Sequence, residues 1–129
     1  AMIDIDDFKM MNDRFGHVTG DKAIRHICDY IKSIIKENDY IGRYGGDEFV
    51  LVLNSFKSND IAKFIEYLSH IPKLEGLMPL SISGGVIKCD GRESSDRLIY
   101  RADLALMKAK QNGKDTILLD QSSREFKFY

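Results

Sequence analysis

The stretch from Ile41 to Leu53 restricts the fold of this chain most, because two glycines separate two runs of strand-forming residues. Glycine adopts backbone angles that other residues avoid, so Gly45 and Gly46 between such runs predict a β-hairpin. Two carboxylates, Asp47 and Glu48, follow the turn directly. A turn without side chains beside two acids suits the close approach of a phosphate or a metal-bound nucleotide. Taken alone, the same residues also fit an ordinary hairpin with solvated acids at its tip.

The composition is that of one soluble globular domain. The chain has 129 residues, of which 43% are hydrophobic and 30% are charged, and its net charge is −1. This balance gives no electrostatic attraction to nucleic acid or to an anionic membrane. Cys28 and Cys89 form no CxxC pair, which indicates thiols in a reducing compartment. We therefore expect a cytoplasmic domain with no nucleic-acid partner and no direct membrane contact, and membrane tethering of a longer parent protein stays open.

Hydrophobic periodicity predicts the order β-α-β-β-α-β-α-β. An α/β (α+β) fold follows, with a ferredoxin-like βαββαβ unit and a mixed central sheet flanked by helices. The domain is expected over residues 1–120, with 121–129 as a tail or linker. The expected elements are a strand at 2–6, a helical turn at 7–13, a helix at about 20–37, the hairpin, a helix from 59 or 60 to 70, a strand at 80–88, a helix from 94 or 95 to 112 and a strand at 116–119.

A second acid, Asp4, closes the predicted first strand. In a βαββαβ unit this strand runs beside the hairpin, so Asp4 and Asp47 are expected to lie close together although they are 43 positions apart. Mg²⁺ binds through one or two carboxylates together with substrate phosphates, and a pair of such ions can support phosphoryl displacement. The alternative for Asp4 is a solvated acid at a strand end.

Basic residues that could hold a phosphate tail occur near both ends of the chain. Lys9 follows the first strand, and Lys110 and Lys114 bracket the end of the last predicted helix. Lysines at a helix C-terminus also complement the helix dipole, so this pattern has a purely structural explanation too. The side chains of Asn12 and Asp21 could hydrogen-bond a purine edge, although spacing alone indicates this only weakly.

Eight segments together resemble one family. Residues 43–49 read RYGGDEF, which resembles the signature of the GGDEF family, the diguanylate cyclases. The remaining segments resemble other conserved blocks of that family and follow in the same order: DIDDFK at 4–9, NDRFGH at 12–17, GD at 20–21, SGGV at 83–86, RADLAL at 101–106, and AK and GK at 109–110 and 113–114.

The resemblance implies the palm fold of nucleotidyl cyclases and the condensation of two GTP molecules to cyclic di-GMP with release of pyrophosphate. It implies Mg²⁺ or Mn²⁺ as cofactor and a homodimer in which each copy supplies half of the reaction. It further implies a sensor or phosphodiesterase domain elsewhere in the full-length protein. The runner-up is a catalytically weak GTP-binding regulatory module that controls an attached domain.

The resemblance also assigns roles to residues. Asp4, the Ile5 carbonyl and Asp47 would hold the metal, and Glu48 would assist the metals and help to activate the 3′-hydroxyl. Gly45 and Gly46 would let the backbone approach the nucleotide. The remaining substrate-binding positions would be Phe8, Lys9, Asn12, Asp21, Lys110 and Lys114.

The chain departs from the family pattern in three places. The RxxD motif of the product-inhibition site reads Lys36 to Asp39 here, and lysine lacks the bidentate fork of arginine, so we expect weak or no feedback binding. Met107 and Asp115 replace a usual Tyr and Asn. The usual N-terminal segment with an LTGLxNR-like motif does not precede the first strand, and this truncation is expected to weaken dimerisation and turnover.

Overall fold

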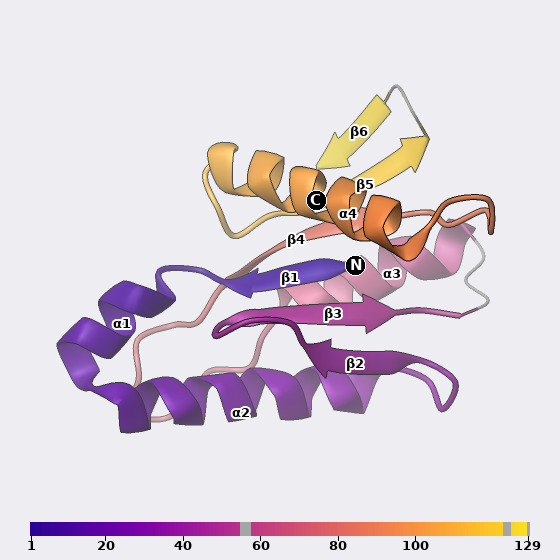
Figure 1. The fold of residues 1–129 in the computed structure, drawn as a ribbon. Helices are drawn as coiled ribbons and strands as arrows, with labels where there is room; N and C mark the ends of the chain where they lie inside the picture. The colour runs from indigo at the N-terminus through magenta and orange to yellow at the C-terminus, as the bar shows by residue number, and fades with distance from the viewer. Residues whose placement is uncertain (55–57, 123–124, 129) are drawn as a thin grey trace.

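A computed structural model describes residues 1–54, 58–122 and 125–128. Six strands form one sheet in the order β2-β3-β1-β4-β5-β6 (Figure 1). Only β4 and β5 pair in parallel, and all other neighbours are antiparallel. The mixed, ferredoxin-like sheet predicted from the sequence is therefore confirmed. The strands are β1 (Met2–Ile5), β2 (Tyr40–Arg43), β3 (Glu48–Val52), β4 (Ile82–Ile87), β5 (Ile117–Ser122) and β6 (Glu125–Phe128).

The described helices are α1 (Phe8–Phe15), α2 (His17–Ile34), α3 (Ser58–Ser69) and α4 (Ser95–Gln111). None of these helices is long and apolar enough to span a bilayer. The Ser94 side chain caps α4 by accepting a hydrogen bond from the backbone N–H of Arg97.

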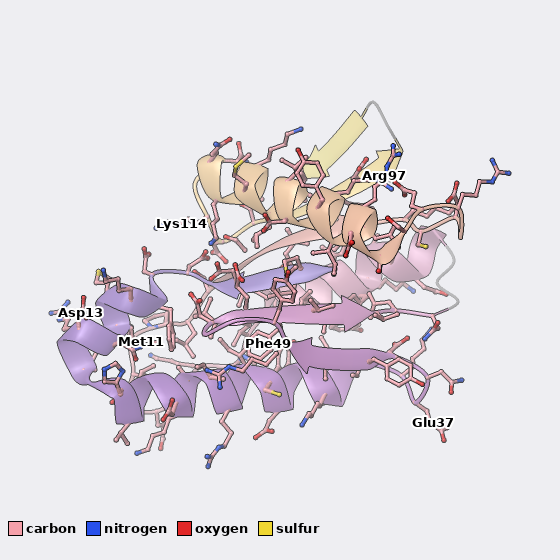
Figure 2. All side chains as sticks on the ribbon, viewed as in Figure 1. Met11, Asp13, Glu37, Phe49, Arg97 and Lys114 are labelled. Atoms are coloured by element: carbon pink, nitrogen blue, oxygen red, sulfur yellow. The ribbon has the colours of Figure 1, made fainter. Side chains whose placement is uncertain are left out.

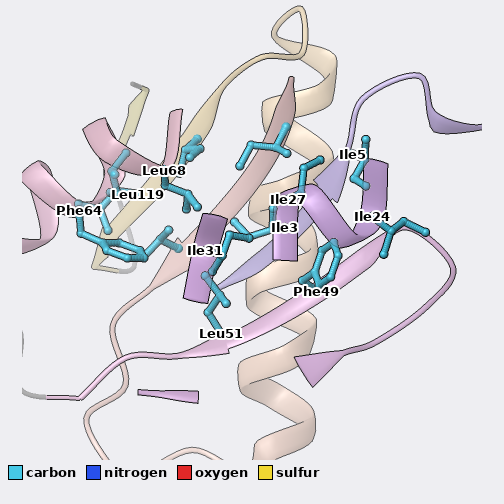
Figure 3. Close-up of a cluster of buried hydrophobic side chains, with 14 residues drawn as sticks. Ile3, Ile5, Ile24, Ile27, Ile31, Phe49, Leu51, Phe64, Leu68 and Leu119 are labelled. Atoms are coloured by element: carbon cyan, nitrogen blue, oxygen red, sulfur yellow. The ribbon is translucent and has the colours of Figure 1, made fainter. Parts of the chain in front are cut away.

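The main hydrophobic core lies between the sheet and the pair α2 and α3 (Figure 3). Alternate residues of β1, β3, β4 and β5 point to this side, and they meet the apolar stripe of α2 that the 3.6-residue period predicts. The opposite face of the sheet is covered by α4. The labelled core side chains are Ile3 and Ile5 of β1, Ile24, Ile27 and Ile31 of α2, Phe49 and Leu51 of β3, Phe64 and Leu68 of α3, and Leu119 of β5.

Gly85 allows α4 to lie directly on β4. A Cβ at this position would come within 2.2 Å of the Ala102 carbonyl oxygen and 2.5 Å of the Leu106 nitrogen. Both are backbone atoms of α4, so the helix would have to move away from the sheet. Gly42, in β2, has no atom within 4 Å of such a Cβ.

Replacing Gly85 with Ala should therefore lower the free energy of unfolding by about 3 kcal/mol, because the added methyl group overpacks the contact between helix and sheet. Gly42→Ala is the matched control and should change it by less than about 0.5 kcal/mol. Urea unfolding followed by circular dichroism measures both values. Equal midpoints for the two variants would contradict this account of Gly85.

The start of α2 differs from the sequence prediction. The helix begins at His17 rather than at Gly20, because Gly16, with φ of 88°, alone breaks the chain between α1 and α2. Gly20 lies inside α2 and is buried. A Cβ there would meet the Asn12 side-chain oxygen at 1.8 Å and the Phe8 ring at 3.2 Å. This glycine therefore serves the packing of α1 against α2 instead of interrupting a loop.

The C-terminal segment also differs. Where the sequence predicts a tail or linker at 121–129, Gln121 and Ser122 complete β5, and Glu125–Phe128 forms β6 antiparallel to it. Residues 123–124 and 129 lie outside the described part of the chain. The short alternating run EFKF is a strand pattern that the sequence analysis passed over.

Candidate active site

Three segments that are distant in sequence meet at one end of the sheet. They are the C-terminal end of β1, the turn between β2 and β3, and the C-terminal end of α4 (Figure 1). Because side chains alternate along a strand, Met2 and Asp4 both point to the face covered by α4. Met2 packs there against Ala102 and Leu106 of α4. Asp4 lies one pleat further along, next to the last turn of that helix.

Asp4 is a buried carboxylate with only 4% of its surface exposed. Its carboxyl oxygen contacts the ammonium group of Lys110, and the carboxyl group of Asp47 lies close enough to interact with it. Burial raises the pKa of Asp4 from 3.8 to about 6, the contact with Lys110 opposes this rise, and Asp47 adds to it. The proximity of Asp4 to Asp47 that the sequence predicts is therefore present in the structure.

The same acids also shift the pKa of Lys110. Burial alone lowers the pKa of its ammonium group, but the contact with Asp4 and the charges of Asp47 and Glu48 outweigh burial and raise it. Glu48 is the cross-strand partner of Asp4 in the β1–β3 ladder. Three acidic side chains, Asp4 of β1, Asp47 of the turn between β2 and β3, and Glu48 of β3, thus act on one lysine from α4.

The loop from β1 to α1 lies at the same end of the sheet. Asp7 adopts a left-handed conformation with φ of 55°, and its carboxylate pairs with Lys114, which is labelled in Figure 2. This pair raises the pKa of Lys114. Phe8 and Lys9 form the first turn of α1, where free backbone N–H groups favour anions. Lys9 is exposed, and Phe8 is half-buried against the core.

The turn between β2 and β3 is closed at its base by the Glu48 carbonyl, which accepts hydrogen bonds from the N–H groups of Tyr44 at 2.8 Å and Gly45 at 3.3 Å. Neither Gly45 nor Gly46 has a positive φ, so the conformational reason given for this glycine pair in the sequence analysis is wrong. A Cβ on Gly46 would have no atom within 4 Å. The space beside Gly46 is therefore open, and a glycine is not needed there for backbone conformation.

Asn12 and Asp21 lie on neighbouring helices, α1 and α2. The side-chain oxygen of Asn12 is buried against Gly20 and has no hydrogen-bond partner among the described residues. A buried polar atom without a partner is costly, and a ligand that donates a hydrogen bond would remove that cost. Asp21 borders a groove of about 580 Å³ between α2 and β2, together with Ile24, Arg43 and Phe49.

The donor set fits a hard divalent cation that a substrate helps to bind. Within the described ranges, no three acidic, histidine or cysteine side chains are arranged to hold a metal ion by themselves. Mg²⁺ needs only one or two carboxylates when phosphates and water complete its shell. The raised pKa of Asp4 shows that its charge is unfavourable where it stands, and a divalent cation between Asp4 and Asp47 would relieve this. The backbone N–H of Ile5 donates to the Asp47 carbonyl at 3.1 Å, which places Ile5 beside this pair.

Comparison with known proteins gives the family. A family model described as "Diguanylate cyclase, GGDEF domain" matches residues 1–116. The chain belongs to the GGDEF family. Diguanylate cyclase DgcP of Pseudomonas aeruginosa is 36% identical over 123 residues, which cover 91% of this chain and 18% of that protein. Diguanylate cyclase DosC of Escherichia coli (strain K12) is 35% identical over 129 residues, which cover 95% of this chain and 28% of that protein.

Solved GGDEF structures have the same fold. Diguanylate cyclase SiaD of Pseudomonas aeruginosa, in complex with its activator SiaC, superposes with a TM-score of 0.83 at 30% identity, covering 92% of this chain and 48% of that chain. The GGDEF domain of DgcB from Caulobacter crescentus, in complex with c-di-GMP, gives 0.82 at 28%, covering 94% and 76%. The chain spans less than a third of the length of the curated relatives DgcP and DosC.

The sequence analysis missed one residue that organises the site of this GGDEF domain. The carboxylate of Asp6 accepts hydrogen bonds from the hydroxyl groups of Ser81 at 2.7 Å and Ser83 at 2.6 Å, and from the backbone N–H of Asp115 at 2.9 Å. Asp6 thereby joins the end of β1 to β4 and to the loop after α4. Its place in the alternation Asp4, Ile5, Asp6 was the signal, because alternate residues share a face.

Asp39, expected in a degenerate inhibitory site with Lys36, has a structural role in this GGDEF domain. Its carboxylate accepts hydrogen bonds from the backbone N–H groups of Lys36 at 2.8 Å and Asn54 at 2.7 Å. It is only 7% exposed. These contacts close the loop between α2 and β2, at the opposite end of β2 from the glycine turn (Figure 1). Weak or absent feedback binding at this position stays a prediction.

Proposed function

We propose that this GGDEF domain condenses two molecules of GTP to cyclic di-GMP and releases pyrophosphate, with each of two facing copies holding one GTP. The observation that carries the proposal is the group of Asp4, Asp47 and Lys110, which lies beside the open space at Gly46. A buried acid, Asp4, that faces the half-buried Asp47 beside a lysine is costly in the free domain, and a metal-bound triphosphate has the charges to complete the group.

In this proposal Asp4, the Ile5 carbonyl and Asp47 bind Mg²⁺ or Mn²⁺, which supplies charge neutralisation at the reacting phosphate when it is bound. Lys110 and Lys114 exchange their contacts with Asp4 and Asp7 for triphosphate oxygens. The first turn of α1, at Phe8 and Lys9, offers N–H groups to the same phosphates.

Asn12, Asp21 and Glu48 act on the guanine base and on the reacting 3′-hydroxyl. Asn12 and Asp21 hydrogen-bond the guanine, and the Asn12 oxygen gains the donor that it lacks in the free domain. Glu48 lies opposite Asp4 and helps to take the proton from the 3′-hydroxyl of the GTP held by the partner copy. That 3′-oxygen then attacks the α-phosphate, and pyrophosphate leaves. In the second step the 3′-oxygen of the other nucleotide attacks the remaining α-phosphate, a second pyrophosphate leaves, and the ring closes.

The test is a turnover assay on the chain brought into a dimer by a fused coiled coil. With GTP and Mg²⁺ we expect cyclic di-GMP and pyrophosphate, identified by mass spectrometry. Asp47→Ala should lower the rate below detection, because it removes one of the two facing carboxylates. Asp60→Ala, on α3, is the matched control and should keep the wild-type rate. Binding of GTP without product in the wild-type dimer would refute the cyclase proposal and favour a regulatory GTP-binding module.

A further inference from the structure

Arg43, the last residue of β2, makes contacts for which the proposed function gives no role. Its guanidinium group donates from Nη2 to the Gly46 carbonyl at 2.6 Å, and from Nε to the carbonyls of Gly46 at 3.1 Å and Gly45 at 3.2 Å. One side chain therefore binds both carbonyl groups of the glycine pair. The planar, multi-donor guanidinium is the side chain best suited to such a fork.

These contacts fix the direction of the peptide groups in the turn. The described chain contains no cis peptide bond, and in a trans peptide the C=O and the following N–H point in opposite directions. Because the carbonyls of Gly45 and Gly46 point toward Arg43, the N–H groups of Gly46 and Asp47 point away from it. The turn thus presents two donors on the side opposite Arg43, and successive N–H groups of this kind form anion-binding sites.

The turn needs an external constraint. Two consecutive glycines have more conformational freedom than any other pair, and neither Gly45 nor Gly46 adopts the positive φ that would make glycine the preferred residue. A Cβ on Gly46 would contact nothing, so packing does not hold the tip of the turn either. The hydrogen bonds from Arg43 to the carbonyls of Gly45 and Gly46 supply this constraint.

We propose that Arg43 is a positioning residue that locks the Gly45–Gly46 turn, so that the N–H groups of Gly46 and Asp47 and the Asp47 carboxylate are held ready for the nucleotide. Arg43 acts through the turn and not on the substrate. Its effect on turnover rests on the proposed cyclase function, whereas its effect on the turn does not.

The direct test is NMR relaxation of ¹⁵N-labelled protein without nucleotide. We expect backbone order parameters for Gly45 and Gly46 near the rigid value of about 0.85 in the wild type and below about 0.6 in Arg43→Met, which keeps the side-chain length and removes every donor. Arg97→Met is the matched control, because Arg97 is an exposed arginine of α4 that pairs with Glu93, far from the turn (Figure 2). It should leave both order parameters at the wild-type value. Unchanged order parameters in Arg43→Met would overturn the proposal.

Arg43→Lys keeps the positive charge but removes the planar fork of guanidinium donors, so it shows which of the two holds the turn. If the planar fork holds the turn, the lysine variant should also lose order at Gly45 and Gly46. Wild-type order parameters in Arg43→Lys would show that a positive charge suffices, and they would overturn the proposed role of the fork.

Turnover gives the second measurement. In the coiled-coil dimer, Arg43→Met should lower kcat by about 10²-fold, the scale of loss expected when reacting groups are misplaced. A loosened turn with an unchanged kcat would overturn the claim that the turn must be locked for reaction. If the wild type makes no cyclic di-GMP, the cyclase proposal fails, and the relaxation data still decide whether Arg43 locks the turn.

Discussion

Asp4→Asn should lower cyclic di-GMP formation by about 10³-fold and should stabilise the metal-free domain at neutral pH. The loss of activity follows from removing one of the two facing carboxylates, because charge neutralisation by bound metal contributes several kcal/mol to such reactions. The gain in stability follows from removing a buried charge that the fold tolerates poorly. An ordinary structural acid would show the opposite effect on stability.

The pH dependence of the free energy of unfolding follows from the pKa of Asp4 and shows that its charge lowers stability. The pKa of Asp4 is 3.8 in the unfolded chain and about 6 in the folded domain. Between these values the folded protein keeps a proton that the unfolded chain has lost, so the free energy of unfolding falls as pH rises from about 4 to 6 and stays lower above that window. Asparagine does not titrate, so Asp4→Asn should lack this part of the fall, which is on the order of 2 kcal/mol.

Urea unfolding at pH 4.5 and pH 7.5 in the presence of a chelator measures the free energy of unfolding of the wild type and of Asp4→Asn, and its dependence on pH. The difference between the two pH values should be smaller for Asp4→Asn than for the wild type. Addition of Mg²⁺ with a non-hydrolysable GTP analogue should then stabilise the wild type and leave the variant nearly unchanged, because only a state that binds ligand gains from it. Identical pH profiles for the two proteins would contradict the account of Asp4.

Gly46→Ala should preserve the fold and weaken nucleotide binding. Because the φ of Gly46 is not positive and a Cβ there meets no atom, the free energy of unfolding should stay within about 1 kcal/mol of the wild type. The added methyl group would fill the space through which the backbone is approached. We expect a loss of about 2 kcal/mol in affinity for a GTP analogue, which is roughly 30-fold in Kd.

Isothermal titration calorimetry and thermal unfolding measure these two effects on the same preparation. A plain hairpin turn would give the opposite pattern, with unchanged affinity and a change in stability alone. Wild-type affinity in a folded Gly46→Ala protein would therefore remove the glycine pair from the binding site.

The place of the first strand beside the hairpin, and with it the approach of Asp4 to Asp47, could be predicted from the sequence, because a βαββαβ pattern restricts which strands can be neighbours. The family follows from motif order, and the family-model match confirms it. The role of Gly20 could not be predicted, since it depends on what surrounds an absent side chain. The contacts of Arg43 and Asp6 were missed because their partners are backbone groups and hydroxyls; the alternation Asp4, Ile5, Asp6 places Asp6 on the face of Asp4 but does not indicate those partners.

The contacts of Asp6 also have a consequence for synthesis of the protein. Asp6 binds partners that are 75, 77 and 109 positions away along the chain. Contacts of such long range form late in folding, because a large loop must close before they contribute. A ribosome must therefore release the chain beyond Asp115 before the loop between β1 and α1 can be fixed in place by these contacts.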